Sequence, residues 1–434
     1  MRMTRMAAVV AATMVAAGPA LADSLHFPML NYRTGPFAPN GIAFADGYQD
    51  YLTLLNERDG GIGGVPIRFT ECETAYNTER GVECYQSIRG DNPLIIQPLS
   101  TGITYQIIPR ATQDGIPVHS MGYGRTSAVN GEVFNWVFNY PATYWDGASV
   151  IINHLLAEND GSLAGKKIAL VYHNSAYGRE PIPTLNRLSE ELGFEFLALG
   201  VDSPGQEQRS QWLQIRRERP DYVLMWGWGV MNPTAIQEAA NIRFPMNNFY
   251  GVWWSGSEQD VMPVGDGAHG YRSLAMHGTG TDYPIYADIQ NYVIEPGLYA
   301  GTGDEVGTVL YSRGLYAAML ATEAARTAQE IHGTPNITAA MMRDGMASLE
   351  MTEERMAALG LPGFGPEFSV SCQNHGGSGA AMIQEWDANT GTWNLITDWI
   401  DSDREMIMEM VMEDSLAYAA ENDIEPQCLE RSGG

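Results

Sequence analysis

Short apolar runs alternate with amphipathic stretches in the first third of the chain. Ile42, Ala45, Tyr48, Leu52 and Leu55 recur at helical spacing, which predicts an amphipathic helix over residues 42–57. A pair of glycines follows and can end this helix, because glycine accepts a positive φ. Strands alternating with helices are typical of a parallel sheet covered by helices on both faces. The strands expected here are 25–31, 65–70, 94–97 and 117–120, with a further helix over 78–89.

The same alternation repeats in the middle of the chain. Strand-like runs begin near Ile168, Glu195, Tyr222 and Phe249, about one strand–helix unit apart. Two successive arrays predict two α/β lobes, and the default place for a ligand is the cleft between them. A long helix is expected over 306–331 and hairpin-like strands over 382–399. The helices expected within the second array are 182–192, 206–217 and 233–241.

The first 22 residues have the pattern of a secretory signal peptide. A basic start precedes an apolar stretch over residues 6–17, and Ala20, Leu21 and Ala22 form a small-x-small cleavage signal. We expect cleavage after Ala22, so that the mature chain begins at Asp23. The alternative, a membrane anchor, is not favoured because the apolar stretch is too short to span a bilayer.

The chain is strongly acidic. It has 52 aspartates and glutamates against 25 lysines and arginines, a net charge of −27, and cleavage of the leader removes two more arginines. This balance argues against nucleic acid and against anionic membrane surfaces as partners.

Four cysteines suit an oxidising compartment. Of the three possible pairings, we favour Cys72 with Cys84, which are close in sequence, and Cys372 with Cys428. A metal site at Cys72 and Cys84 is not favoured, because no second close pair accompanies them.

Motifs of catalysis are missing from the sequence. It has no G-x-S-x-G elbow and no Walker loop, and GTGDEVG at 301–307 has the wrong glycine spacing for a dinucleotide loop. The eight histidines are scattered, and His173, at a strand end, is better explained as a structural residue. We therefore expect no enzyme activity, no cofactor and no metal.

Four tryptophans follow strand-like runs. Trp226 and Trp228 end VLMWGW, and Trp253 and Trp254 end YGVWW. Open α/β sheets bind ligands at the carboxyl ends of their strands, so these rings predict a pocket wall. The alternative is packing between the lobe core and the hinge, and we expect at least two of the four in the cleft.

An anion site is predicted where Ser100 and Thr101 separate a strand from a helix. Their hydroxyls and the free N–H groups of the helix are typical anion donors, although a plain helix cap explains them equally well. Downstream, MGYGRTSA at 121–128 places Tyr123 and Arg125 near the same edge. Arg125 could pair with a carboxylate in bidentate fashion; the alternative is a surface arginine.

Five segments in order resemble the leucine/isoleucine/valine-binding type of periplasmic substrate-binding protein, which delivers ligands to ABC importers. They are TGPFAPNG, LLNERDGGIGGVPIRF, PLSTGIT, KKIALVYHNSAYGRE and DSPGQEQ, and the likeness covers roughly residues 25–330. The resemblance implies a periplasmic monomer with the type I fold, two Rossmann-like lobes with mostly parallel sheets, joined by a three-crossing hinge and closing on ligand. Its partners would be a small molecule and the membrane permease subunits of the importer. The expected division is 23–140 with about 275–345 for lobe 1, 141–274 with about 346–400 for lobe 2, and an acidic extension over 401–434.

Family roles can be carried onto matching positions. The ligand carboxylate site falls on Ser100, Thr101 and the backbone near Gly122 and Tyr123. The resemblance further implies a clamp tyrosine at Tyr177, a tyrosine position occupied by Trp228, and a loop contact at Asn40. The bridge between Cys72 and Cys84 resembles a first-lobe disulfide of the family, with the second cysteine displaced.

One departure concerns the ligand's ammonium group. Amino-acid binders of the family place an acid where this chain has Val252, Trp253 and Trp254. An indole only donates hydrogen bonds, and a buried ammonium left unpaired would cost several kcal/mol. We therefore expect an amino-free carboxylate with an apolar or aromatic body. A branched-chain or other amino acid paired with Glu258 or Asp260 is the alternative, and a sensory protein of the same fold stays open beside a transport role.

Overall fold

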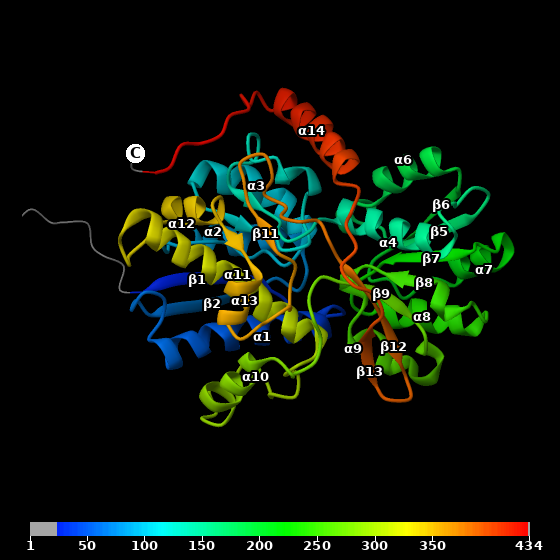
Figure 1. Ribbon diagram of the computed structural model, residues 1–434, viewed down its shortest axis with the longest axis horizontal. Helices are drawn as coiled ribbons and strands as arrows, with labels where there is room; N and C mark the ends of the chain where they lie inside the picture. The colour runs from blue at the N-terminus through cyan, green and yellow to red at the C-terminus, as the bar shows by residue number, and fades with distance from the viewer. Residues whose placement is uncertain (1–23, 433–434) are drawn as a thin grey trace, which may run out of the picture.

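Two α/β lobes, each a sheet covered by helices, form the protein in a computed structural model that describes residues 24–432 (Figure 1). The expected fold, two Rossmann-like lobes with mostly parallel sheets joined by three crossings of the chain, is confirmed. The predicted signal peptide lies outside the described residues. Within them, no helix combines the length and apolarity that a bilayer crossing requires.

Lobe 1 is built on parallel strands that pair in the order β2, β1, residues 96–97, β3 and β4. Met29 bridges Gln97, and Ile96 bridges Val118, so the short strand predicted at 94–97 joins two strand pairs into one layer. The elements of its first part are β1 Leu25–Asn31, α1 Ala38–Asp59, β2 Ile67–Glu73, α2 Thr78–Ile88, α3 Thr101–Asp114, β3 Val118–His119, the 3-10 turn η1 Thr126–Val129 and β4 Val137–Phe138.

Lobe 2 contains a seven-stranded sheet in the order β13, β12, β9, β8, β7, β5, β6. The strands from β6 to β9 are parallel, and β12 and β13 add an antiparallel hairpin at one edge. Strand β7 is buried along its whole length, as expected for a central strand covered on both faces. The elements are α4 Tyr144–Glu158, β5 Lys167–His173, α5 Ala176–Arg179, α6 Ile182–Leu192, β6 Glu195–Val201, α7 Arg209–Glu218, β7 Tyr222–Trp226, α8 Met231–Asn241, η2 Met246–Asn248, β8 Phe249–Gly251, η3 Trp253–Ser255, α9 Glu258–Val261, η4 Met262–Ala268, β9 Arg272–Ala275, β12 Met382–Asp387 and β13 Thr392–Leu395.

The chain returns to lobe 1 after β9 and adds a helical layer. The helix predicted over 306–331 is α11, and it crosses α1 closely at Gly47 and Gly314. A Cβ on Gly314 would lie 1.9 Å from the carbonyl oxygen of Phe44, so only glycine permits this approach. The elements of this layer are α10 Pro284–Ile289, η5 Gln290–Ile294, α11 Val309–His332, α12 Ala339–Met346, β10 Glu350–Met351, α13 Glu353–Ala358 and β11 Phe368–Ser369.

The segment over 346–369, which the sequence division assigns to lobe 2, contacts the helices of lobe 1. Arg355 of α13 forms an ion pair with Glu323 of α11, with 2.7 Å between Nε and Oε2. The third crossing therefore follows β11, and the chain then enters β12.

The acidic extension forms α14, Arg404–Glu421, which lies over the junction of the lobes (Figure 1). Arg404 at its start donates to the buried Asp146 of lobe 2 at 2.8 Å. Farther along, Asp414 pairs with Arg125 of lobe 1, and Tyr418 stacks on Phe134 with 4.8 Å between ring centroids. We call this region, α14 with its partners on both lobes, the flank.

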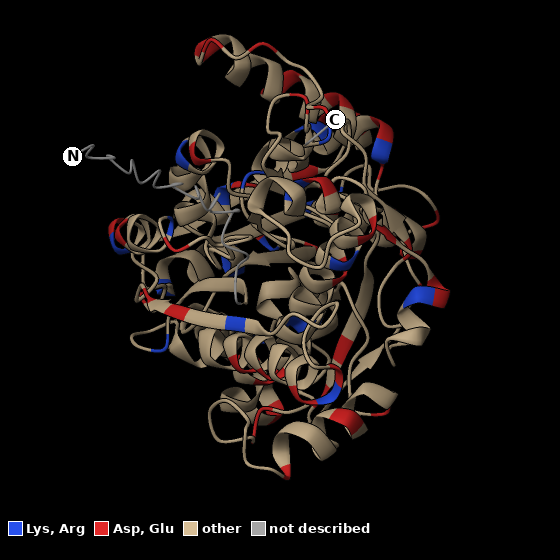
Figure 2. Cartoon of the chain, turned by 90° about the vertical axis from the view of Figure 1, so that its left-hand side faces the viewer, with Lys and Arg blue, Asp and Glu red and all other residues tan. Residues whose placement is uncertain are grey.

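Both favoured disulfides are present. Cys72 bonds Cys84 and Cys372 bonds Cys428, with Cα separations of 5.7 and 5.8 Å. The second bond attaches the segment after α14 to the crossing that follows β11. The acidic residues are spread over many elements rather than gathered on one face (Figure 2).

Candidate functional site

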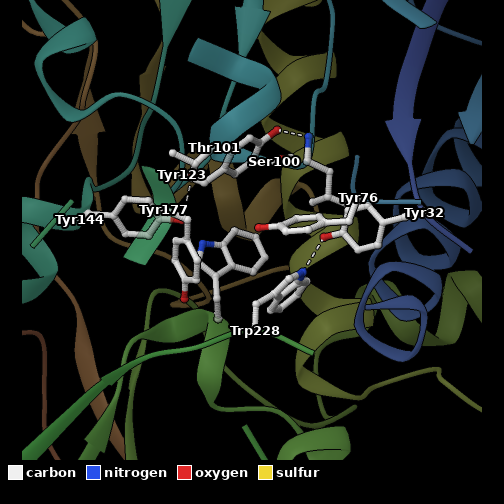
Figure 3. Close-up of a pocket in the computed structure, with 10 residues that line it drawn as sticks. Tyr32, Tyr76, Ser100, Thr101, Tyr123, Tyr144, Tyr177 and Trp228 are labelled. Atoms are coloured by element: carbon white, nitrogen blue, oxygen red, sulfur yellow. Dashed lines mark hydrogen bonds between the residues drawn. The ribbon is translucent and has the colours of Figure 1, made fainter. Parts of the chain in front are cut away.

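A cavity lies between the lobes, and its empty space of about 250 Å³ is partly open to solvent (Figure 3). Five tyrosines and two tryptophans form most of its wall, and no charged side chain lines it. The lining residues are Tyr32, Tyr76, Leu99, Ser100, Thr101, Tyr123, Tyr144, Tyr177, Trp228 and Trp254.

The cavity is assembled from strand ends. Tyr32 follows β1, Tyr76 follows β2, Tyr177 follows β5, and Trp228 follows β7. The carboxyl ends of parallel strands meet at one edge of each sheet, and the two lobes present these edges to each other. Tyr144 is different, because it begins α4 directly after the first crossing between the lobes.

Lobe 1 contributes the polar end of the cavity at the start of α3. Ser100 is the N-cap, and its Oγ accepts from the backbone N–H of Ile103 at 3.4 Å. Thr101 Oγ1 accepts from the N–H of Gly124 at 3.1 Å and lies 3.4 Å from the Tyr144 hydroxyl. The first N–H groups of a helix have no acceptor within it and carry the positive end of its dipole. This end of the cavity is therefore suited to an anion.

Several phenol groups are fixed by bonds to the protein. The Tyr123 hydroxyl accepts from the backbone N–H of Leu99 at 2.8 Å and from Gln97 Nε2 at 3.0 Å. The Tyr177 hydroxyl donates to the carbonyl of Gly227 at 2.8 Å. Burial raises the pKa of both phenols well above the ordinary value, so they remain neutral. These rings form a rigid, uncharged wall.

Indole N–H groups of lobe 2 bond to lobe 1 and hold the cleft closed. Trp253 and Trp254 both donate to the carbonyl of Gly122, at 2.8 and 2.9 Å. Trp228 Nε1 donates to the Tyr32 hydroxyl at 2.9 Å. Each of these bonds joins a neutral donor to a neutral acceptor.

Six of the predicted ligand-binding residues line the cavity, and two lie directly behind it. The backbone N–H of Gly122 is bonded to the Asn139 carbonyl at 3.3 Å, and that of Tyr123 to the Ser120 carbonyl at 3.0 Å. The backbone groups predicted for a carboxylate at this point are therefore occupied within the protein. Trp253 stacks on Tyr144 at 6.1 Å and forms a second layer of the wall. The six lining residues are Ser100, Thr101, Tyr123, Tyr177, Trp228 and Trp254.

Three other predicted residues lie away from the cavity. Arg125 pairs with Asp414, and its guanidinium lies 4.7 Å from the ring centroid of Tyr418, because α14 covers it. Trp226 is fully buried in β7, where it belongs to the lobe core. Asn40 Nδ2 donates to Asp260 Oδ1 at 3.3 Å and so makes a contact between lobes.

Four residues that line the cavity were not predicted from the sequence: Tyr32, Tyr76, Leu99 and Tyr144. The rule that singled out the tryptophans, an aromatic ring just after a strand, applies equally to Tyr32 and Tyr76 and would have found them. Tyr144 carries no such signal, since its place depends on the path of the first crossing.

The acids considered as ammonium partners do not line the cavity. Asp260 accepts from Ser257 and from Asn232 Nδ2 at 2.9 Å, and burial raises its pKa. Glu258 accepts from the backbone N–H of Val309 at 3.0 Å, and burial raises its pKa to about 7. Both carboxyls are engaged in contacts within the protein. His173, considered a structural histidine, is buried and bonds Ser175 Oγ at 2.8 Å.

Comparison with known proteins gives consistent matches over nearly the whole chain. The sequence model of a family described as periplasmic binding protein matches residues 24–392. A crystal structure from the Pseudomonas fluorescens group, described as an ABC transporter permease, has a TM-score of 0.87 and 36% identity over 94% of this chain and 100% of that chain. A search of curated protein sequences found no match.

Two more distant structures share the fold and contain different ligands. One is a branched-chain amino acid ABC transporter from Thermus thermophilus with bound valine, with a TM-score of 0.76 and 19% identity over 90% of this chain and 99% of that chain. The other is a solute-binding protein of an ABC transporter from R. palustris in complex with benzoate, with a TM-score of 0.67 and 15% identity over 88% and 98%.

Proposed function

The chain belongs to the periplasmic binding protein family, and from this premise we propose that it traps a small carboxylate with a flat apolar body and delivers it to an ABC importer. One observation carries the choice of ligand: the cavity joins a helix N-terminus to aromatic walls and has no acidic side chain in its lining. The carboxylate would meet Ser100, Thr101 and the first N–H groups of α3, and the flat body would lie among the tyrosines and tryptophans.

An ammonium group would meet no carboxylate in the lining of this cavity. The indoles of Trp228 and Trp254 only donate hydrogen bonds, and the hydroxyl groups of the lining are neutral acceptors that bring no negative charge. Asp260 and Glu258 are separated from the cavity and bonded elsewhere. The benzoate complex of a protein with the same fold supports this choice, because it shows that the fold can hold an aromatic carboxylate.

The predicted export of this protein is consistent with its family, whose members are periplasmic. We place the cleavage site after Ala22, so that the mature protein begins at Asp23, and propose that it acts as a monomer with the membrane subunits of the importer as partners. The two disulfides are consistent with an oxidising compartment.

Calorimetric titration of the mature protein, residues 23–434, tests the ligand class. Benzoate and phenylacetate would be compared with phenylalanine and valine under the same conditions. Binding of the amino-free acids, with no heat from the amino acids, is the expected result. Binding of the amino acids alone would overturn the proposal.

A branched-chain or other amino acid is the second candidate, favoured by the valine complex of a structure with the same fold. It requires Glu258 or Asp260 to supply the missing charge when ligand is bound. Glu258→Gln and Asp260→Asn would then each weaken valine binding, and unchanged affinity in both variants would eliminate this candidate.

A further inference from the structure

Arg313 is a fully buried arginine without an acidic partner. It lies on α11, next to the close crossing of α1 and α11 at Gly314. Its Nη1 donates to the carbonyl of Trp253, its Nε lies 3.2 Å from His277 Nε2, and its Nη2 has no hydrogen-bond partner. Arg343, the other buried arginine in the described part of the chain, pairs with Asp344.

The neighbours of Arg313 do not neutralise its charge. Burial lowers the pKa of His277 to about 3, so its ring is neutral. His277 Nδ1 lies 2.7 Å from the Gly278 carbonyl and donates to it, which leaves Nε2 as an acceptor for Arg313. Burial lowers the pKa of Arg313 to about 9 despite the more distant carboxylates of Asp260 and Glu258, so the guanidinium is still charged at neutral pH. A buried cation without a counter-ion is costly. The chain has 52 acidic residues, yet none of them forms an ion pair with Arg313 in the described residues.

The cavity is next to this charge. The guanidinium carbon lies 5.1 Å from the ring centroid of Trp254, and Trp254 lines the cavity. Its charge also acts on Tyr177, another lining residue, by lowering the pKa of that phenol against the larger effect of burial. The guanidinium is therefore separated from the ligand space by one aromatic layer.

We propose that Arg313 is the counter-charge of the bound ligand, and that it selects an anion and rejects an ammonium group by acting across Trp254. This inference rests on the proposed function and adds to it the residue that sets the charge preference. The helix N-terminus holds the carboxylate directly, whereas Arg313 makes the whole cavity electropositive. At an effective dielectric constant of about 20, a unit charge roughly 8–10 Å away changes the affinity for an anion by about fifteen- to thirtyfold.

The experiment compares ligands that share a shape and differ in charge. Benzoate, benzamide and benzylamine are titrated by calorimetry into the mature parent, Arg313→Met and Arg313→Lys. Methionine keeps much of the apolar stem, and lysine keeps the charge. Arg125→Met is the matched control, because this arginine lies on the flank and does not line the cavity.

The parent is expected to prefer benzoate to benzamide by at least tenfold and to give no heat with benzylamine. Arg313→Met should lose about tenfold or more in benzoate affinity and stay within threefold for benzamide, while Arg313→Lys and Arg125→Met should keep the parental preference. Equal losses for benzoate and benzamide would mean that Arg313 only supports closure through Trp253, and the inference would fail while the proposed function stood.

The parent alone also tests the inference if Arg313→Met does not fold. Equal affinity of the parent for benzoate and benzamide would overturn a charge-selecting role for Arg313 without any variant. Binding of valine or phenylalanine with no binding of benzoate would instead overturn the proposed function itself.

Discussion

The indole bonds of the cleft and the ion pairs of the flank join the two lobes by different chemistry. In the cleft, the indoles of Trp228, Trp253 and Trp254 donate to a hydroxyl and a carbonyl, all of them neutral groups. On the flank, Arg404 and Asp414 of α14 form ion pairs, and a disulfide fixes the segment beyond. Neutral hydrogen bonds exchange readily with water or ligand at little net cost, whereas a buried carboxylate deprived of its cation is strongly destabilising.

The difference indicates which region opens. We expect the cleft bonds to break when ligand enters or leaves, while the flank stays formed and lies close to the pivot. Substitutions that disrupt one region at a time test this expectation.

Arg404→Met breaks the flank at its most buried point. Asp146 is fully buried, so removal of the cation leaves its carboxylate with only neutral donors. We expect a loss of about 3 kcal/mol in the free energy of unfolding, measured from the urea midpoint. In the matched variant Arg187→Met, the partner Glu409 is half exposed, and a loss below about 1 kcal/mol is expected. Equal losses in the two variants would contradict the distinction between buried and exposed pairs.

Trp228→Ala breaks the cleft instead. It removes an aromatic wall and the bond to Tyr32, and we expect benzoate affinity to fall by about thirtyfold, or about 2 kcal/mol. Trp226→Phe is the control, because Trp226 lies in the core of lobe 2, two residues earlier. Its benzoate affinity should stay within twofold of the parent. A larger loss of benzoate affinity in Trp226→Phe than in Trp228→Ala would contradict the assignment of Trp228 to the cavity wall and of Trp226 to the core.

A contact between the lobes at Glu180 should respond to pH. Glu180 of lobe 2 accepts from the Thr126 hydroxyl of lobe 1 at 2.7 Å, and burial raises its pKa to about 7 from an ordinary value of 4.5. The Glu180 carboxyl therefore holds its proton more tightly in the closed protein than it would in water. Its contribution to closure is complete below pH 4.5 and is lost as the pH rises through 7.

Benzoate affinity should consequently decrease by about tenfold between pH 5 and pH 8, as measured by calorimetry. Glu258 bonds Val309 across the lobes, and burial raises its pKa to about 7 as well, so it contributes to the same slope. Glu180→Gln should flatten part of the dependence, and the double variant with Glu258→Gln should remove most of it. An affinity that rises with pH in the parent would show that neither group acts as described.

Among the changes expected to weaken benzoate binding, Ser100→Ala should have the smallest effect. The change removes one hydroxyl at the start of α3 but keeps the N–H groups of the helix, so benzoate affinity should fall by about fivefold. Benzamide serves as the control ligand, with a smaller loss expected, because a neutral amide gains less from this end of the helix.

The sequence predicted the fold because most strands of the two parallel sheets are short apolar runs followed by a helical pattern, although β4 and β9 were not predicted. The same rule placed Trp228 and Trp254 at strand ends, where both line the cavity. It could not separate Trp226 from Trp228, since the end of β7 lies between them and only the observed boundary shows which ring belongs to the core.

The contacts of the flank could not be predicted from the sequence, for a different reason. Arg125 follows a strand end and looks suited to a ligand carboxylate, yet Asp414, nearly 300 residues later, occupies it. A contact between such distant segments leaves no periodic signal in either one. Arg313 was overlooked similarly, because its neighbours on α11 read as an ordinary buried helix face.

The indoles at the lobe junction also give the protein a built-in optical reporter. Three of its ten tryptophans, at positions 228, 253 and 254, have their N–H groups bonded across the cleft, whereas Trp212 and Trp226 lie within the core of lobe 2. Opening would transfer the first set to water and leave the second unchanged. A red shift of the emission spectrum would then follow lobe movement in real time, without any attached dye.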